Sequence, residues 1–309
     1  MTSQPASPNA AAEISVVVVT YNSADTIGAC LESIERGGAR AEIVVVDNAS
    51  SDGSAGLVAQ EFPAVRLVAN PINEGFARGC NRGWRATTAP FVLLLNPDTE
   101  LRPGATRALL EFARAHLRAA LVGPRILNAD GSLQHSCFRF PNLRMVVTGF
   151  FGLVPLDSPA NGRYRPEEYE RPHPVEHLLG ACLLVRREAA EQVGLLDDGF
   201  YMYFEETDLC YRLRRAGWES WYTPDATVIH HGAHSTSREP ERMSAAFYRS
   251  QARFYQKHYR LPAYLALKAL SVLGVTYWTA RTARGLLRRR VSAATARRRL
   301  ASYWSIVWA

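Results

Sequence analysis

Residues 14–20, Ile-Ser-Val-Val-Val-Val-Thr, decide the fold of this chain. A continuous run of β-branched residues is typical of a strand buried on both faces, as in a parallel sheet covered by helices. A helix pattern follows over residues 25–35, with Ser23 or Asp25 as its expected N-cap and Gly37-Gly38 after its end. A strand that leads into a helix in this way is the first half of a βαβ unit.

The alternation of strand and helix patterns continues along the chain. Strands are predicted at residues 43–47, 65–69 and 91–95, and helices at 54–62, 76–86 and 103–117. This order predicts an α/β fold with a doubly wound, mostly parallel sheet. Further along, the pattern predicts irregular structure over 135–175, a helix at 205–216, short strands within 219–231 and a helix at 241–258.

The composition is that of a globular protein. Of the 309 residues, 47% are hydrophobic and 21% are charged, which excludes wholesale disorder, a collagen-like chain and a protein with many membrane spans. The five cysteines have no zinc-ligand spacing, and residues 1–13 carry no signal-peptide pattern. We therefore expect a cytoplasmic protein with reduced thiols and a disordered leader over residues 1–13.

The net charge of +7 conceals two parts of opposite sign. Residues 1–241 hold 22 basic and all 29 acidic side chains, whereas residues 242–309 hold 14 basic side chains and no acid. Such an asymmetry points the C-terminal part at an anionic surface. No nucleic-acid-binding module is recognised, so nucleic acid is not an expected partner.

The basic C-terminal part also has an apolar segment. Residues 261–280 are long enough to span a bilayer but contain Lys268 and several small or polar residues, and eight arginines follow in 281–299. Basic clusters flanked by aromatic and aliphatic residues fit helices that lie in a membrane interface. We expect residues 259–309 to form a basic amphipathic helical tail on an anionic membrane surface; a helical hairpin packed on the body is the alternative.

Polar residues follow each predicted strand, at the edge of a parallel sheet where ligands bind. They occupy residues 20–22, 47–54, 70–76 and 96–98. Four polar strand ends at one edge describe a nucleotide-sized site. The chain has neither GxGxxG nor GxxxxGK[ST], which excludes the dinucleotide-binding and P-loop interpretations.

These strand ends belong to a series of five motifs. In chain order they are VVVVTYN, VVVDNASSDGS, NEGFARGCNRG, LLLNPDTE and GACLLVRREAAEQVGLLDDGFYMYFEETDLCYRLRRAGW. Over residues 14–235 the series resembles family 2 glycosyltransferases, and most of all their rhamnosyltransferase-like branch. The resemblance implies a Rossmann-like GT-A fold, an inverting mechanism and a nucleoside-diphosphate-sugar donor. It implies a catalytic domain over 14–258, with a donor half at 14–125 and an acceptor and catalytic half at 126–258.

By this resemblance, one set of residues matches the donor-binding loops of the family. The set is Thr20, Tyr21, Asn22, Asp47, Asn48, Ser50, Asn73, Gly75, Phe76, Asn81 and Asn96. Asp47 matches the carboxylate that holds the pyrimidine base, and an acceptor-only carboxylate suits the imide N–H of uracil and thymine alike. Gly75 would allow a close backbone approach.

A divalent metal is the cofactor that the resemblance implies. The segment 96–98 (Asn-Pro-Asp) stands where many relatives have Asp-x-Asp, so Asp98 matches the ligand of Mg²⁺ or Mn²⁺. The family carries a metal- or phosphate-contacting histidine near His230, His231 and His234. Of these, His230 matches best and His231 is the alternative. A zinc site built from the three histidines alone is not expected.

Three acids crowd the predicted start of the helix at 205–216. Asp208 and Arg212 are spaced i,i+4 and are expected to pair. The usual family pattern is Glu-Asp-x-Asp, whose second member is the general base. That position is Glu206 in this chain, and Glu205 is the reserve.

The acceptor side is matched to the motif that begins at Gly180. Gly180 and Ala181 are small and would leave room for a sugar. Tyr203 and Trp218 have the ring character that stacks on sugars, although packing in the core explains either residue equally well.

The sequence as a whole predicts an inverting, metal-dependent hexosyltransferase. The favoured reaction moves L-rhamnose from dTDP-rhamnose, with a UDP-sugar as the other donor considered, to a hydroxyl of a glycan or polyprenyl-linked saccharide in cell-envelope polysaccharide biosynthesis. The expected location is the cytoplasm, at the inner face of the plasma membrane. One alternative is a non-catalytic nucleotide-sugar-binding or assembly protein. Another is a sugar-phosphate nucleotidyltransferase, which would need a Gly-rich basic loop that VVVVTYN lacks.

Overall fold

The computed structural model describes residues 12–155, 157–232 and 240–307. One mixed, mostly parallel sheet organises the chain, in the order β3-β2-β1-β4-β10-β6-β11-β5, with β8 paired to β11. The strands are β1 (Ile14–Thr20), β2 (Ala41–Asp47), β3 (Arg66–Ala69), β4 (Phe91–Leu95), β5 (Thr99–Leu101), β6 (Ala119–Leu127), β8 (His173–Val175), β10 (Cys182–Arg186) and β11 (Glu219–His230). The predicted α/β sheet is confirmed, and most of the predicted leader lies outside the described residues.

The parallel part of the sheet has β1 at its centre. β1 pairs in parallel with β2 and β4, and β2 pairs in parallel with β3. All seven residues of β1 are buried, because alternate side chains face two different cores. Val16 and Val18 enter one core, whereas Val17 and Val19 enter the other. The β-branched run therefore does what its pattern predicts.

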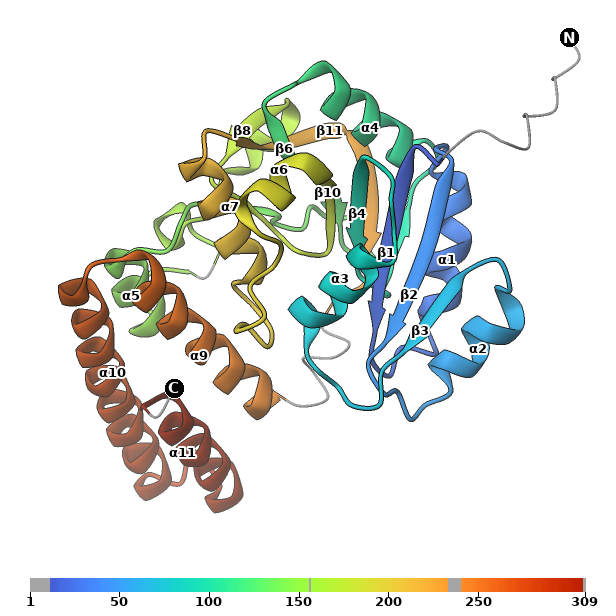
Figure 1. Cartoon of the computed structure of the whole chain (residues 1–309). Helices are drawn as coiled ribbons and strands as arrows, with labels where there is room; N and C mark the ends of the chain where they lie inside the picture. Colours follow the sequence, from blue (N-terminus) through green and yellow to red (C-terminus); the bar gives the residue numbers. More distant parts are fainter. Residues whose placement is uncertain (1–11, 156, 233–239, 308–309) are drawn as a thin grey trace, which may run out of the picture.

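Helices cover both faces of this sheet. They are α1 (Ile27–Arg36), α2 (Ser54–Glu61), α3 (Phe76–Arg85), α4 (Ala105–Ala115), α5 (Leu143–Phe150), α6 (Arg187–Val193), α7 (Glu205–Arg215), α9 (Pro240–His258), α10 (Leu261–Leu287) and α11 (Ala293–Val307). Figure 1 shows α10 and α11 as a pair at the far end of the molecule from β2 and β3. A two-stranded sheet of β7 (Cys137–Phe138) and β9 (His177–Leu178) completes the fold.

Three expectations differ from the structure. The residue before α1 is Thr26, not Ser23 or Asp25, and the side chain of Thr26 makes no capping hydrogen bond. Residues 219–231 form one long strand with two irregularities rather than short strands. The segment 135–175, expected to be irregular, contains β7, α5, β8 and two 3₁₀ helices, at Pro159–Asn161 and Pro166–Glu170.

The second half of the chain builds into the same sheet. β10 lies antiparallel between β4 and β6, and β6 pairs in parallel with β11. β6 runs across the predicted division at residues 125 and 126. The donor and acceptor halves therefore share one sheet, and the division of roles between them stays a prediction.

A buried carboxylate joins α7 to α9. Asp208 is fully buried, with Oδ2 accepting from Arg212 Nε at 2.7 Å and Oδ1 lying 2.6 Å from His258 Nε2 and 2.7 Å from Lys257 Nζ. The predicted Asp208–Arg212 pair is confirmed. Arg212 also donates to the carbonyl groups of residues 193–195, which follow α6. We call these four side chains the Asp208 cluster.

The burial of the Asp208 cluster predicts that a change of Asp208 lowers the free energy of unfolding. Replacing Asp208→Asn leaves the Arg212 and Lys257 charges around a neutral amide, and removing one partner of a buried ion pair costs about 3–5 kcal/mol. We expect denaturant unfolding to show a loss of that size. Exposed Asp157→Asn is the matched control and should change the free energy of unfolding far less. Equal losses in the two variants would contradict this account.

Candidate functional site

A cavity of about 290 Å³ opens at the carboxyl ends of β1 and β4. Its walls come from the loops after β1 and β2, the segment before α3, the β4–β5 turn and the segment before β10. The end of β11, the segment that leads into α7 with its first turn, and the first turn of α9 complete them. The predicted residues that line it are Tyr21, Asn22, Asn48, Asn73, Gly75, Phe76, Asn96, Asp98, Gly180, Ala181, Tyr203, Glu205, Glu206 and His230. The fold thus brings together most of the predicted site.

Two predicted residues lie just behind the cavity with unused polar atoms. Thr20 and Asp47 are register partners at the ends of β1 and β2, and both are buried. Asp47 Oδ2 accepts from the Ser50 N–H at 3.0 Å, but Asp47 Oδ1 and Thr20 Oγ1 have no hydrogen-bond partner among the described residues. A buried carboxylate oxygen without a partner is costly, so these atoms fit a ligand that brings a donor.

The loops after β1 and β2 are tied to each other. The Asn22 N–H donates to Ser50 Oγ at 2.9 Å, and the Ser51 N–H donates to Asn22 Oδ1 at 2.8 Å. Asn22 and Ala49 both have positive φ, at +53° and +61°. Left-handed backbone at a residue other than glycine costs about 1 kcal/mol or more, and it concentrates at binding sites. Ser50 therefore positions Asn22 and does not line the cavity.

Gly75 and Asn81 each contact a segment far away in the sequence. Gly75 (φ +89°) gives close approach to the main chain of Tyr201, whose carbonyl oxygen a Cβ would strike and which accepts the Phe76 N–H at 2.9 Å. Asn81 does not line the cavity: it donates to Leu196 O at 2.8 Å and accepts from the Leu196 N–H. Asn81 holds the loop after α6 against α3, and its place in the donor-binding set stays a prediction.

Asp98 and His230, the two predicted metal ligands, meet at the cavity. His230 Nε2 lies 3.3 Å from Asp98 Oδ1 and 3.5 Å from Asn96 Nδ2. His230 Nδ1 lies 2.7 Å from Gln134 Oε1, while Gln134 Nε2 donates to Asn128 Oδ1 at 2.7 Å. Asn128 orients the Gln134 amide so that its oxygen faces His230 Nδ1, and we therefore assign the ring proton to Nδ1. The Nε2 atom then carries the free electron pair.

The other histidines do not join this pair. His231 turns away to Glu100, with Nε2 and Oε1 2.7 Å apart, so His230 is the histidine at the cavity. His234 lies outside the described residues. In the part of the chain that the structure describes, no group of three or more His, Cys, Asp and Glu side chains could hold a metal. A carboxylate and an imidazole alone fit a cation that takes its remaining ligands from phosphate and water.

Glu205 and Glu206 begin α7 opposite that pair. Glu205 is buried, and the Oε2 atoms of both glutamates have no hydrogen-bond partner among the described residues. Burial raises the pKa of both carboxyls, and the Glu206 charge raises the pKa of Glu205 further. Glu206 is therefore the one that ionises first and can accept a proton.

The residues predicted for the acceptor side line the same cavity as Glu206. A Cβ built on Gly180 would lie 3.8 Å from the Glu206 carboxyl carbon, so the glycine leaves that space open. Tyr203 and Phe204 both have positive φ, at +67° and +66°, and this paired strain fixes the entry into α7. Tyr203 lines the cavity, whereas Trp218 packs on the core and donates to Gln192.

Sequence reasoning missed several residues of this site. Gln134, Tyr201, Arg242 and Met243 each position or line the cavity. Tyr201 belongs to the quoted motif, but nothing in its letters marks its carbonyl group as the part that matters. Gln134 lies in a connection whose pattern gives no signal, so only the folded chain identifies it.

Comparison with known proteins points to one family. The family model described as Glycosyl transferase family 2 matches residues 15–194. The N-acetylglucosaminyl-diphospho-decaprenol L-rhamnosyltransferase of Mycobacterium tuberculosis is 38% identical over 249 residues, which cover 76% of this chain and 81% of the relative. Rhamnosyltransferase WbbL of Escherichia coli is 24% identical over 228 residues, covering 71% of this chain and 83% of WbbL.

Solved structures share the fold. Mannosyltransferase PcManGT from Pyrobaculum calidifontis, solved with GDP-Man and Mn²⁺, gives a TM-score of 0.56 at 17% identity and covers 97% of this chain and 88% of that one. GalNAc-T7, solved with UDP, GalNAc and Mn²⁺, gives 0.54 at 17% identity over 71% of this chain and 44% of that one. The sheet and its helices thus form the GT-A fold expected from the motifs.

The raised pKa values of Glu205 and Glu206 predict how the rate depends on pH. Their raised pKa values mean that protons stay bound where an ordinary glutamate is ionised, so the rate should rise with pH as Glu206 loses its proton. We expect Glu206→Gln to lower turnover about 100-fold or more, since a general base contributes about that factor. Glu205→Gln should retain most turnover. Steady-state rates measured against pH for both variants distinguish the two glutamates. If Glu205→Gln lost turnover and Glu206→Gln kept it, Glu205 would be the base.

Proposed function

Because the chain belongs to glycosyl transferase family 2, we propose that it is an inverting transferase that moves L-rhamnose from dTDP-rhamnose to a polyprenyl-linked saccharide. The observation that carries the proposal is a single cavity with the Asp98–His230 pair on one wall and the paired glutamates on another. The choice of rhamnose and of a lipid-linked acceptor is supported by the 38% identity to the mycobacterial rhamnosyltransferase. The product would enter cell-envelope polysaccharide.

The donor would lie along the ends of β1, β2 and β4. Asp47 would accept the imide N–H of thymine or uracil, because its Oδ1 is buried and without a partner among the described residues. Asp98 and His230 would hold Mg²⁺ or Mn²⁺, which would neutralise charge on the departing nucleoside diphosphate. Gln134 would keep His230 in the tautomer that leaves Nε2 free.

The acceptor would enter beside Gly180. Glu206 would take the proton of the acceptor hydroxyl while that oxygen bonds to the anomeric carbon and the bond from this carbon to the diphosphate oxygen breaks. Attack from the face opposite the leaving group inverts the configuration. Tyr203 would form part of the sugar-facing wall. A non-catalytic sugar-nucleotide-binding protein is not favoured, because such a protein needs no pair of buried glutamates with raised pKa values.

The proposed location is the cytoplasmic side of the plasma membrane, where a lipid-linked acceptor would be met. Among the described helices, α10 is long and apolar enough to cross a membrane by length and composition, and 22% of its most apolar window is buried. That measure alone is weak support. We favour a peripheral position, since α10 leads directly into an arginine-rich turn and α11.

Donor choice tests the function directly. We expect the protein with Mn²⁺ to hydrolyse dTDP-rhamnose slowly without acceptor and to leave GDP-sugars intact, as measured by release of nucleoside diphosphate. Asp47→Asn should weaken dTDP binding about 10- to 100-fold, because an amide presents donors to the imide N–H. Exposed Asp25→Asn is the matched control. Preference for a purine donor would overturn the assignment of Asp47.

A change of Gln134, the amide that orients His230, tests the proposed metal site of Asp98 and His230. Gln134→Leu should weaken Mn²⁺ affinity about 10- to 100-fold, the usual effect of losing a partner that orients a ligand histidine. Asp98→Ala should abolish transfer. His231→Asn is the control, because His231 faces Glu100 instead of the cavity. If His231→Asn reduced Mn²⁺ binding in calorimetry and Gln134→Leu did not, His231 would be the ligand.

A further inference from the structure

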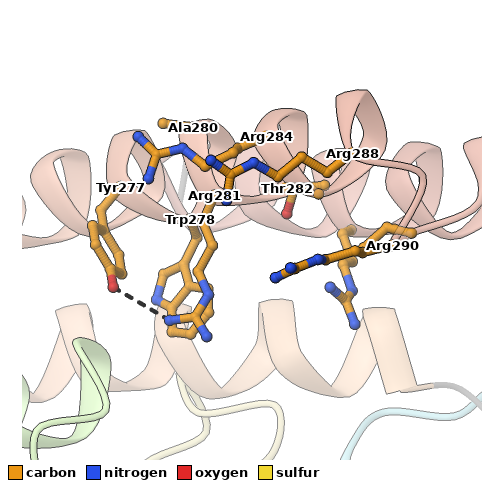
Figure 2. Close-up of a pocket in the computed structure, with 11 residues that line it drawn as sticks. Tyr277, Trp278, Ala280, Arg281, Thr282, Arg284, Arg288 and Arg290 are labelled. Carbon is orange, nitrogen blue, oxygen red and sulfur yellow. Dashed lines mark hydrogen bonds between the residues drawn. The ribbon is translucent and has the colours of Figure 1, made fainter.

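A second cavity lies between α10 and α11, with a volume of about 530 Å³. Five arginines line it: Arg281, Arg284, Arg288, Arg290 and Arg299. Figure 2 shows Arg281 lying along Trp278 and Arg290 extending toward them from the turn after α10. We call this space the arginine cavity.

The backbone turn that closes α10 supplies part of the arginine cavity. Arg289 has φ +55°, the Arg289 N–H donates to Leu286 O at 3.0 Å and the Arg290 N–H donates to Gly285 O at 2.8 Å. This is the Schellman arrangement, in which the left-handed position is usually glycine. An arginine here is strained, and the turn carries Arg288 and Arg290 to the same cavity.

The charge of the arginine cavity is not neutralised within the described chain. No ion pair joins any of its five arginines to a carboxylate in the ranges that the structure describes, and residues 242–309 contain no acid at all. Arg281 instead lies over the Trp278 ring at 5.1 Å and donates to the Tyr277 hydroxyl at 3.3 Å. Several guanidinium groups that line one cavity match the several oxygens of a phosphate group.

Apolar side chains are exposed on the helix that carries these arginines. Leu273, Tyr277 and Leu287 of α10 are 60%, 42% and 84% exposed, and Val272 is 48% exposed. A helix that presents aliphatic and aromatic side chains next to converging arginines has the chemistry of a membrane interface, where acyl chains meet charged headgroups.

The arginine cavity is separate from the catalytic cavity. No residue lines both cavities. Aromatic packing fills the space between them: Phe247 packs on Tyr203 at 5.8 Å, Tyr248 packs on Phe150 at 5.6 Å, and Trp278 donates to Phe150 O at 2.8 Å. The arginine cavity is therefore a binding place of its own and not an extension of the cavity that holds Glu206.

We propose that the arginine cavity binds the phosphate headgroup of an anionic bilayer phospholipid and so seats the α10–α11 hairpin on the membrane. The proposal rests on the membrane location given above and adds to it a defined, saturable site in place of diffuse charge attraction. The exposed apolar residues of α10 would lie among the acyl chains of the same lipids.

The test compares two triple variants with equal loss of charge. Arg284→Gln/Arg288→Gln/Arg290→Gln changes the arginine cavity, whereas Arg260→Gln/Arg297→Gln/Arg298→Gln changes exposed arginines of the same C-terminal part that do not line it. Flotation with phosphatidylglycerol-containing vesicles measures affinity. We expect the cavity variant to bind the vesicles about 100-fold more weakly than the unaltered protein, because three arginines are lost from the site. The control variant should bind only about tenfold more weakly than the unaltered protein.

Each remaining outcome decides as well. Equal losses of affinity in both variants would show that the attraction is diffuse and would overturn the proposed site. Failure of the unaltered protein to bind the vesicles would overturn it as well. If the cavity variant bound phosphatidylglycerol normally but lost binding to phosphatidylcholine vesicles containing polyprenyl diphosphate, the ligand would be the acceptor lipid. Displacement from phosphatidylglycerol vesicles by inorganic pyrophosphate should be seen for the unaltered protein only. Donor hydrolysis without vesicles should stay unchanged in both variants, so a failed lipid site and a failed catalytic proposal remain distinguishable.

Discussion

The burial of Asp208 is the constraint on which the rest of the structure depends. Burial alone would raise the pKa of this carboxyl. The hydrogen bond with His258 and the contacts with Arg212 and Lys257 lower that pKa, so the carboxylate stays charged in the interior. A buried charge tolerates no loss of its partners. The Asp208 cluster therefore fixes α7, whose first residues are the paired glutamates, against the end of α9. Through α9 it also fixes where α10 and α11 begin.

The catalytic cavity uses two kinds of support around this fixed frame. Strained backbone at Asn22, Ala49, Tyr203 and Phe204 shapes its loops, and interlocking amides hold its polar groups. Gln134 and Asn128 orient His230 from outside the cavity, as Ser50 positions Asn22. The polar atoms left over, on Thr20, Asp47 and the two glutamates, are those that a donor or acceptor would engage. Binding groups are thus held before any ligand arrives.

The periodic parts of the fold could be predicted from sequence. The strands at 14–20 and 91–95 and the helix starts at Ser54, Phe76 and Glu205 agree with their patterns, because each pattern reflects burial of its own residues. β6 and the unbroken β11 were not predicted, since their pairing partners lie far away in the chain. The same holds for the site. Motifs point to Asp98 and Glu206, which the fold brings to one cavity, but Gln134 has no local signal in the sequence.

The sequence by itself determined the family, the alternating fold and the residue types at the strand ends, because these depend on local periodicity and on motifs that carry their own spacing. It also determined the opposite charges of the body and the tail. Only the tertiary structure decided that the side chain of His230 and not that of His231 meets the Asp98 carboxylate, that Gly75 lies against the Tyr201 main chain, and that five arginines line one cavity. Those outcomes depend on which groups become neighbours in space and on how their hydrogen bonds are satisfied, and neither is written in the order of residues.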